Sequence, residues 1–300
     1  MRIVALPAGA DPGDLADWLE IKALAADDGD ASRGDLESAL RPSPGFTERS
    51  ADDVDRIVTD TFSEIRLRQT AASRGYPFDV DEDLLLSTRP DAWTDRSSYL
   101  LCLCLSWFGF AATRGVDAKP ERIFEDLSVA VARNYLGGEA VRFGSPRVPV
   151  ELPASFRVAV TRLAQELLRE GGAASDQRLH WTKDDGLDVV AWRDHPDGGP
   201  GKLILFGACA AGDNWETKVM ELNPVAWVQN WMVRPPTVAP VKAFFLPHRI
   251  RDRWEYHTRR AGMLFDRCRI ASWAPKLPAA AHHGDGIGWA QALVDGLPEL

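Results

Sequence analysis

Apolar residues recur at helical spacing in the first part of the chain. The clearest run predicts a helix over residues 51–72 and consists of Val54, Ile57, Val58, Phe62 and Ile65. Ser50 stands three residues before Asp53, which is an acidic variant of the pattern that begins helices. The periodicity and the start signal agree, so this helix is the firmest local prediction from the sequence.

The rest of the first region follows the same reading. An apolar helix is predicted over 97–113, whereas the polar segment 27–33 predicts a loop and the Pro-rich segment 41–46 predicts a connector. We therefore expect residues 1–115 to form a mostly helical region.

After about residue 115 the pattern changes to helices alternating with short strands. Helical patterns over 120–136 and 152–170 each end at a pair of glycines, which is typical of a helix end. The apolar runs that predict strands are 187–192, 202–209, 241–246 and 262–270. The first two strands are joined by the turn-rich segment 194–199 and are expected to form a hairpin.

Helices are predicted between the later strands, at 215–232 and 250–261, and Pro224 is expected to break or kink the first of these. This order predicts a mixed α/β sheet flanked by helices over residues 116–300, with a short helix in the tail 274–300.

Charge is distributed unevenly between the two regions. The formal net charge is −9, and all of the excess lies in the first 120 residues. The acidic region is therefore expected to contact a protein partner, and the overall charge argues against a protein that coats nucleic acid by bulk attraction.

The cysteines and the apolar runs bear on the cellular compartment and on membrane contact. None of the four cysteines forms a C-x-x-C pair, and the first residues show no secretory leader pattern. The longest mostly apolar run, 99–112, is shorter than the ~20 residues that cross a bilayer. We expect a cytoplasmic protein with no membrane contact.

Two acidic residues are candidates for chemistry. Asp188 begins an apolar strand, where a carboxylate is costly unless it is paired or binds a cation; Asp185, just before it, is either a second ligand or a turn residue. Glu125 lies in the predicted helix RIFEDLSVAVARNYL on a stripe of small residues, which suits a half-buried group that faces a cleft. The alternative is an exposed glutamate favoured by the helix dipole.

The order of these features resembles the PD-(D/E)xK, restriction-endonuclease-like nuclease core, in particular a divergent bacterial, defence-associated member. The resemblance covers residues 118–273 and rests on three features: a helix that carries Glu125, a hairpin with Asp188 on its first strand, and the second strand KLILFGACA, followed by a helix and a strand. It implies that Asp188 and Glu125 hold Mg²⁺ or Mn²⁺ together with a backbone carbonyl near Cys209, and that the ion activates water to attack a phosphodiester.

The second strand departs from the family pattern. The family places Glu or Gln, one residue and then Lys on this strand, whereas this chain has Ala208, Cys209 and Ala210. Lys218 in the next element is the candidate replacement for the lysine, with Lys202 a poorer one, and a plain surface lysine is the alternative reading. The missing acid is expected to weaken metal affinity.

A basic cluster with interleaved aromatic residues follows between positions 242 and 269. Such a cluster suits contacts with a phosphate backbone, although a solvated helix face with local ion pairs has the same composition. The candidate nucleic-acid-binding residues are Arg249, Arg251, Arg253, Arg259 and Arg260.

The sequence thus predicts a metal-dependent nuclease that cleaves DNA in bacterial anti-phage defence or DNA processing. The alternative is a catalytically degenerate nuclease-like subunit that binds nucleic acid or scaffolds a defence complex, and a small-molecule α/β enzyme is a third reading. Ala208 and Ala210 favour the degenerate subunit and Asp188 favours the enzyme. The metal site requires the carboxylates of Glu125 and Asp188 to converge.

Overall fold

The chain forms two compact units, both of which are discontinuous in sequence. The computed structural model describes residues 4–298 except 8, 42–48, 83, 110–111, 113–116, 118, 148–150, 173–182, 213 and 275–280. Unit 1 comprises Met1–Pro120, Arg267–Ser272 and Lys276–Leu300, and unit 2 comprises Glu121–Asp266 and Trp273–Pro275. The first boundary lies close to the expected one after residue 115. The C-terminal segment differs from expectation, because most of it packs with the N-terminal region.

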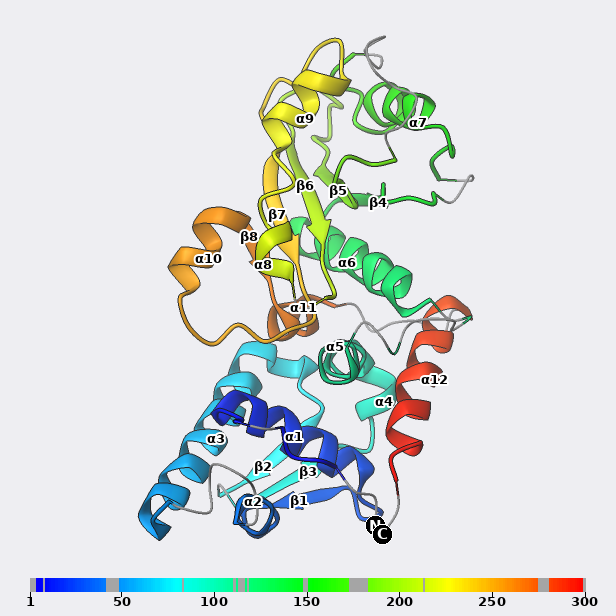
Figure 1. Cartoon of the computed structure of the whole chain (residues 1–300). Helices are drawn as coiled ribbons and strands as arrows, with labels where there is room; N and C mark the ends of the chain where they lie inside the picture. The colour runs from blue at the N-terminus through cyan, green and yellow to red at the C-terminus, as the bar shows by residue number, and fades with distance from the viewer. Residues whose placement is uncertain are drawn as a thin grey trace. The chain divides into compact units, whose positions relative to one another are not determined.

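Unit 1 is mostly helical and also holds a small sheet (Figure 1). Its three strands pair antiparallel in the order β1-β3-β2. The elements are α1 (Pro12–Ala25), β1 (Asp30–Ser32), α2 (Arg33–Leu40), α3 (Ala51–Ala72), η1 (Ser73–Gly75), β2 (Phe78–Asp81), β3 (Leu85–Thr88), α4 (Ala92–Asp95), α5 (Ser97–Phe108), nearly all of α11 (Arg267–Trp273), and α12 (Ala281–Asp295).

The predicted helix over 51–72 is confirmed as α3, and the Ser50 side chain accepts the backbone N–H of Asp53 as the start signal indicated. The apolar helix predicted over 97–113 ends earlier, at Phe108, because Gly109 takes a positive φ of 72°. The loop predicted over 27–33 is wrong in part, since it contains β1. Strands of three or four residues are too short to show a period in the sequence.

A buried ionic cluster centred on Arg68 holds unit 1 together. Arg68 is 1% exposed, and its guanidinium lies 2.6 Å from Asp17, 3.1 Å from Glu20 and 3.0 Å from Glu64. Arg267, from the C-terminal segment, reaches the same Asp17 oxygen at 2.5 Å. The cluster therefore joins three parts of the sequence that are far apart.

The phenol groups of Tyr76 and Tyr99 complete the cluster by donating hydrogen bonds to Glu20 Oε1 at 2.9 and 2.8 Å. Burial opposes ionisation of Asp17, but the charges of Arg267 and Arg68 outweigh it and hold the pKa of Asp17 below its ordinary value. The acids and the guanidinium groups are thus mutually dependent in the folded state.

Unit 2 contains a five-stranded mixed sheet with order β4-β5-β6-β7-β8 (Figure 1). Strands β4, β5 and β6 run antiparallel to their neighbours, and β6, β7 and β8 run parallel. The elements are α6 (Pro120–Leu136), β4 (Glu139–Arg142), α7 (Phe156–Arg162), the π-helical segment η3 (Leu163–Leu167), β5 (Val189–Arg193), β6 (Leu203–Cys209), α8 (Trp215–Lys218), α9 (Pro224–Trp231), β7 (Val241–Phe245), α10 (Trp254–Ala261) and β8 (Met263–Phe265).

Most predicted elements of this region are present with shorter bounds. The hairpin of β5 and β6 is confirmed, with Val190 opposite Phe206. The helix predicted over 215–232 is divided into α8 and α9, because Pro224 takes the first position of α9 and Asn223 caps it. The strand predicted over 262–270 is wrong beyond Phe265, where α11 begins two residues later.

The fold class is therefore mixed α/β, with a five-stranded sheet and a separate three-stranded antiparallel sheet. In unit 2 the rings of Phe143, Phe156 and Phe206 pack edge-on against Trp227 at centroid distances of 5.5, 6.1 and 5.3 Å. This aromatic core anchors α9 and fixes the end of the sheet at which Asp188 lies. Among the described helices, none has the length and apolar character of a membrane span.

Replacing Arg68 with Met should destabilise unit 1 by about 3–5 kcal/mol, because Glu20 and Glu64 would lose the guanidinium beside them and Asp17 would keep only Arg267. Arg56→Met on the same helix is the control, since Arg56 is exposed and pairs only with Asp53 in its own helix; a change within about 0.5 kcal/mol is expected. Urea unfolding of the two variants measures the difference. Equal effects would contradict a central role for Arg68.

Candidate functional site

The structure brings Glu125 and Asp188 together. Glu125 lies on α6 and Asp188 immediately precedes β5. Glu125 Oε2 and Asp188 Oδ1 each lie 3.0 Å from the position that a Cβ would take on Gly144. The two carboxylates therefore converge on the position that a side chain of residue 144 would occupy.

Asp188 is held on every side by the sheet. Its carbonyl oxygen accepts the N–H groups of Phe143 and Gly144 at 2.7 and 3.1 Å, and its own N–H donates to Gly207 at 2.9 Å. Its carboxylate Oδ2 accepts the N–H of Cys209 at 2.7 Å. Both backbone and side chain are fixed, so the carboxylate is preorganised rather than free to turn to solvent.

The negative charges that Glu125 and Asp188 would carry are only partly offset by nearby positive charges and hydrogen-bond donors. Burial raises the pKa of Asp188 well above its ordinary value, and the negative charge of Glu125 raises it further; the Cys209 N–H and the more distant charge of Lys218 oppose the shift only in part. Burial likewise raises the pKa of Glu125 to about 7, despite the guanidinium of Arg142. The folded protein therefore maintains a site that disfavours negative charge unless a cation is added.

Arg142 is a cation already present beside this site. It lies at the end of β4, is 4% exposed, and places Nη1 3.2 Å from Glu125 Oε2 and Nε 2.9 Å from Asp126 Oδ1. Since one guanidinium serves two acids, neither carboxylate of the convergent pair is neutralised by it. The sequence analysis missed Arg142 because β4 was not recognised.

Asp184 adds negative charge nearby, and Asp185 does not. Asp184 accepts the N–H groups of Gly186 and Ser145, both at 3.2 Å, and its charge raises the pKa of both Glu125 and Asp188. Asp185 adopts a positive φ of 55° and accepts the indole N–H of Trp231 at 2.8 Å. The structure thus favours the turn reading of Asp185.

Of the two candidate lysines, only Lys218 acts on the site. It ends α8, is half-buried, and its charge lowers the pKa of Asp188. Lys202 is buried and its ammonium group binds the carbonyl of Leu168 and the carboxylate of Asp194 at 2.6 and 2.5 Å. Lys202 therefore holds the hairpin and is not available for chemistry.

The second strand offers a thiol to the acids. Ala208 and Ala210 are buried in the apolar core of unit 2. Burial, followed by the charges of Asp188 and Glu125, raises the pKa of the Cys209 thiol well above its ordinary value, and Ser128 opposes the shift through a hydrogen bond. Cys209 is consequently a protonated thiol that packs against the acids and donates its backbone N–H to one of them.

The predicted basic cluster is divided by the fold. Arg249 differs from expectation, because its side chain is only 10% exposed and its guanidinium binds the buried Asp266 at 2.9 Å. Arg251, Arg253 and Arg259 are exposed, and Arg259 pairs with Glu255. The sequence alone does not show whether an arginine will pair with a buried acid or remain exposed.

The exposed part of the cluster lies beside α8. Arg253 is 4.0 Å from the carboxylate of Glu216, and Arg260 donates to the carbonyl of the same residue at 3.5 Å. Lys242 on β7 donates from one ammonium group to the carbonyls of Val219 and Arg260 at 2.6 and 2.9 Å. Helix α10 is thereby fixed next to the short helix that carries Lys218.

The arrangement suits a divalent cation with a small protein ligand set. No group of three or more His, Cys, Asp or Glu side chains in the described part of the chain is placed to share a metal ion. The observed donors are two carboxylates around an open space, and Mg²⁺ commonly keeps several waters and takes one or two carboxylates from the protein. The residues present therefore fit such an ion, with water and backbone carbonyls completing its shell.

Comparisons with known proteins give no relative: the chain matches no protein-family model, no curated protein and no solved structure.

Replacing Glu125 with Gln, or Asp188 with Asn, should stabilise the protein in the absence of metal. The pKa of Glu125 is raised from 4.5 to about 7, so its ionisation costs folding free energy that is absent below pH 4.5 and is fully present above pH 7. At pH 8 the Glu125→Gln variant should be more stable than the wild type by on the order of 2 kcal/mol, and the difference should shrink toward pH 5.

Asp266→Asn is the control for this pair, because Asp266 is a buried acid of the same unit that binds Arg249 and the N–H of Ile250. The Asp266→Asn variant should lose about 1–3 kcal/mol of folding stability. Urea unfolding between pH 5 and pH 8 measures all three variants. If Glu125→Gln and Asp188→Asn also lose stability at pH 8, the two acids are structural.

Proposed function

We propose that this chain is a metal-dependent nuclease that cleaves phosphodiester bonds in DNA, in a bacterial anti-phage defence or DNA-processing system. The observation that carries the proposal is the convergence of the Glu125 and Asp188 carboxylates beside Gly144. A fold seldom retains two adjacent, half-buried acids with little compensating positive charge for stability, and perturbed acids of this kind concentrate at functional sites.

Each site residue has a role in the proposed reaction. Asp188 and Glu125 would hold Mg²⁺ or Mn²⁺, which when bound polarises a phosphodiester and lowers the pKa of a water. Lys218 would orient that water and stabilise charge that develops on the phosphate. The exposed Arg251, Arg253 and Arg259 and the half-buried Arg260 would hold the nucleic-acid backbone beside α8.

The order of elements supports the proposed restriction-endonuclease-like identity. Helix α6 carries Glu125, the hairpin β5–β6 carries Asp188 at its start, and helices α8 and α9 lead to β7, which runs parallel to β6. This is the order on which the resemblance to the PD-(D/E)xK core rests. The additional strand β4 supplies Arg142 to the site, and Gly144 follows two residues after its end.

The second candidate is a degenerate nuclease-like subunit that binds nucleic acid or scaffolds a complex without cutting. Its support is the second strand, where Ala208 and Ala210 are core residues, together with Arg142, whose guanidinium lies where it competes with a cation for Glu125. In this reading the acidic unit 1 would contact a protein partner.

Incubation with supercoiled and linear DNA, and with RNA, in the presence of Mg²⁺ or Mn²⁺ separates the two candidates. We expect metal-dependent cutting of DNA by the wild type and a loss of at least ~10²-fold in Asp188→Asn, whose fold is retained. Lys218→Met should reduce cutting by ~10-fold or more without loss of metal binding.

DNA retention completes this test. Charge reversal at Arg259 and Arg260 to Glu should weaken retention, whereas the same reversal at Arg56 and Arg66, exposed on α3, should not. Retention without cutting supports the degenerate subunit. If the protein neither cuts nor retains nucleic acid, even with partners added, both candidates are overturned.

Replacing Gly144 with Ala should abolish divalent-cation binding. The added methyl would lie 3.0 Å from an oxygen of each carboxylate, which is closer than an ordinary contact, so the two carboxylates would have to shift. The backbone of residue 144 can accept alanine, because Gly144 has no positive φ. Isothermal titration with Mn²⁺ should show at least a ~10-fold loss of affinity, equal to about 1.4 kcal/mol. Gly288→Ala, whose methyl meets open space, is the control, and unchanged Mn²⁺ binding in Gly144→Ala would locate the ion elsewhere.

A further inference from the structure

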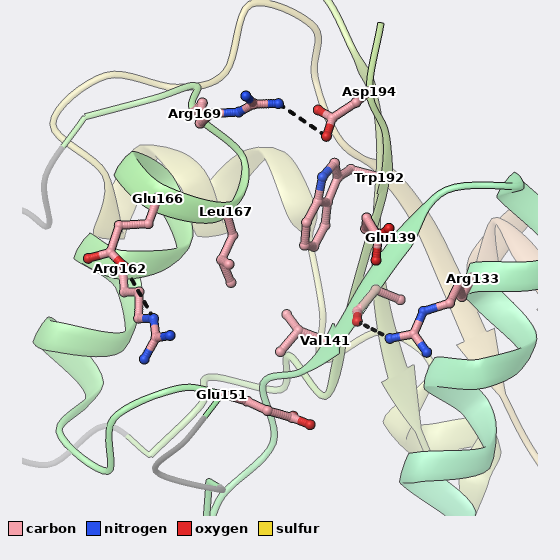
Figure 2. A pocket seen from close by; sticks show the side chains of 11 residues that line it. Arg133, Glu139, Val141, Glu151, Arg162, Glu166, Leu167, Arg169, Trp192 and Asp194 are labelled. Atoms are coloured by element: carbon pink, nitrogen blue, oxygen red, sulfur yellow. Dashed lines mark hydrogen bonds and ion pairs between the residues drawn. The ribbon is translucent and has the colours of Figure 1, made fainter. Parts of the chain in front are cut away.

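A second candidate site lies in unit 2, away from the two carboxylates. An open pocket of about 470 Å³ is lined by residues of β4, β5, the segment from α7 to Arg169, and Arg133 of α6 (Figure 2). This volume is in the range of cavities that bind small molecules. None of Glu125, Asp188 and Lys218 lines it.

An indole without a hydrogen-bond partner forms one wall. Trp192 is 5% exposed, and its Nε1–H has no acceptor among the described residues. The indoles of Trp227 and Trp231 in the same unit donate at 3.1 and 2.8 Å. A buried donor without a partner costs about 1–3 kcal/mol, so Trp192 calls for an acceptor that the cavity itself does not supply.

The remaining wall is apolar. Figure 2 shows the indole of Trp192 facing the cavity, with Leu167 across from it, the indole nitrogen on the edge turned toward Leu167, and Val141 below. The space between the edge of the indole and these aliphatic side chains suits a flat ring. The occupant therefore combines a planar apolar body with a hydrogen-bond acceptor at its edge.

The charges at the rim exclude a strongly anionic occupant. Arg162 pairs with Glu166 at 3.3 Å and Arg169 with Asp194 at 3.2 Å. Arg133 donates to the carbonyl of Ala140 at 2.8 Å and has no carboxylate partner in the described structure.

Two further acids at the rim have no cationic partner among the residues that the structure describes. Glu139 and Glu151 are exposed and make no ion pair with a described residue. Their carboxylates are acceptors for hydroxyl or amino groups, and their charge more than balances that of Arg133. A ligand that carries donors as well as acceptors and no large negative charge therefore fits this rim.

We propose that this pocket binds a neutral heteroaromatic ligand of the nucleoside class, whose ring lies beside the edge of the Trp192 indole and carries an acceptor for its N–H. The sugar hydroxyl and exocyclic amino groups of such a ligand would donate to Glu139 and Glu151. The proposal does not depend on the nuclease activity, because it uses none of the residues of the carboxylate site.

Isothermal titration of the full chain with adenosine, guanosine, cytidine and thymidine tests the proposal. At least one nucleoside should bind with Kd below about 1 mM, and its 5′-monophosphate should bind at least ~10-fold more weakly. In a ¹H–¹⁵N spectrum, the indole signal that disappears in Trp192→Phe should be the one that shifts on titration of the wild type.

Two variants and one control identify the cavity. Trp192→Phe keeps the ring face, removes the donor and should bind ~10-fold more weakly while remaining folded. Leu167→Phe should block binding by filling the space, and Trp273→Phe, an exposed tryptophan outside the cavity, should change nothing. The proposal is overturned if no nucleoside binds, if the monophosphate binds more tightly, or if both cavity variants bind like the wild type.

Discussion

Two carboxyl groups that share one half-buried space are the constraint from which the site in unit 2 follows. Asp188 is fixed by backbone hydrogen bonds from β4 and β6, so it cannot turn away from Glu125. Arg142 is shared with Asp126 and offsets the repulsion only in part. The sheet thus carries an unfavourable electrostatic arrangement that a bound cation would relieve. Proteins commonly break a rule of stability at the residues that carry function.

The elements that could be predicted are those whose information is local. Helix α3 has an unbroken apolar stripe and a capping serine, and the β5–β6 hairpin has two apolar runs around a turn, so both are present as expected. Asp188 could be singled out because an acid at the start of a buried strand contradicts its surroundings. Glu125 could be placed on a helix, but its orientation toward Asp188 came only from a resemblance of element order.

What could not be predicted depends on contacts that are distant in sequence. Strand β4 has four residues and no distinctive pattern, and with it Arg142 and Gly144 were missed. The return of the 267–272 segment to unit 1 rests on Arg267 reaching Asp17 across 250 positions. The cavity beside Trp192 was invisible for the same reason, since an unpaired indole N–H is a property of the packed structure and not of the residue.

Lys242 holds the basic helix α10 and the helix that carries Lys218 at a fixed separation. Lys242 binds the residue that follows Lys218 and also the last turn of α10, so the short helix and the basic helix are attached to the same point of β7. In the proposed nuclease, this attachment would act as a fixed spacer. The position of the cut along a DNA strand would then be determined by where α10 binds the phosphate backbone, and not by the base sequence between that point and the cut.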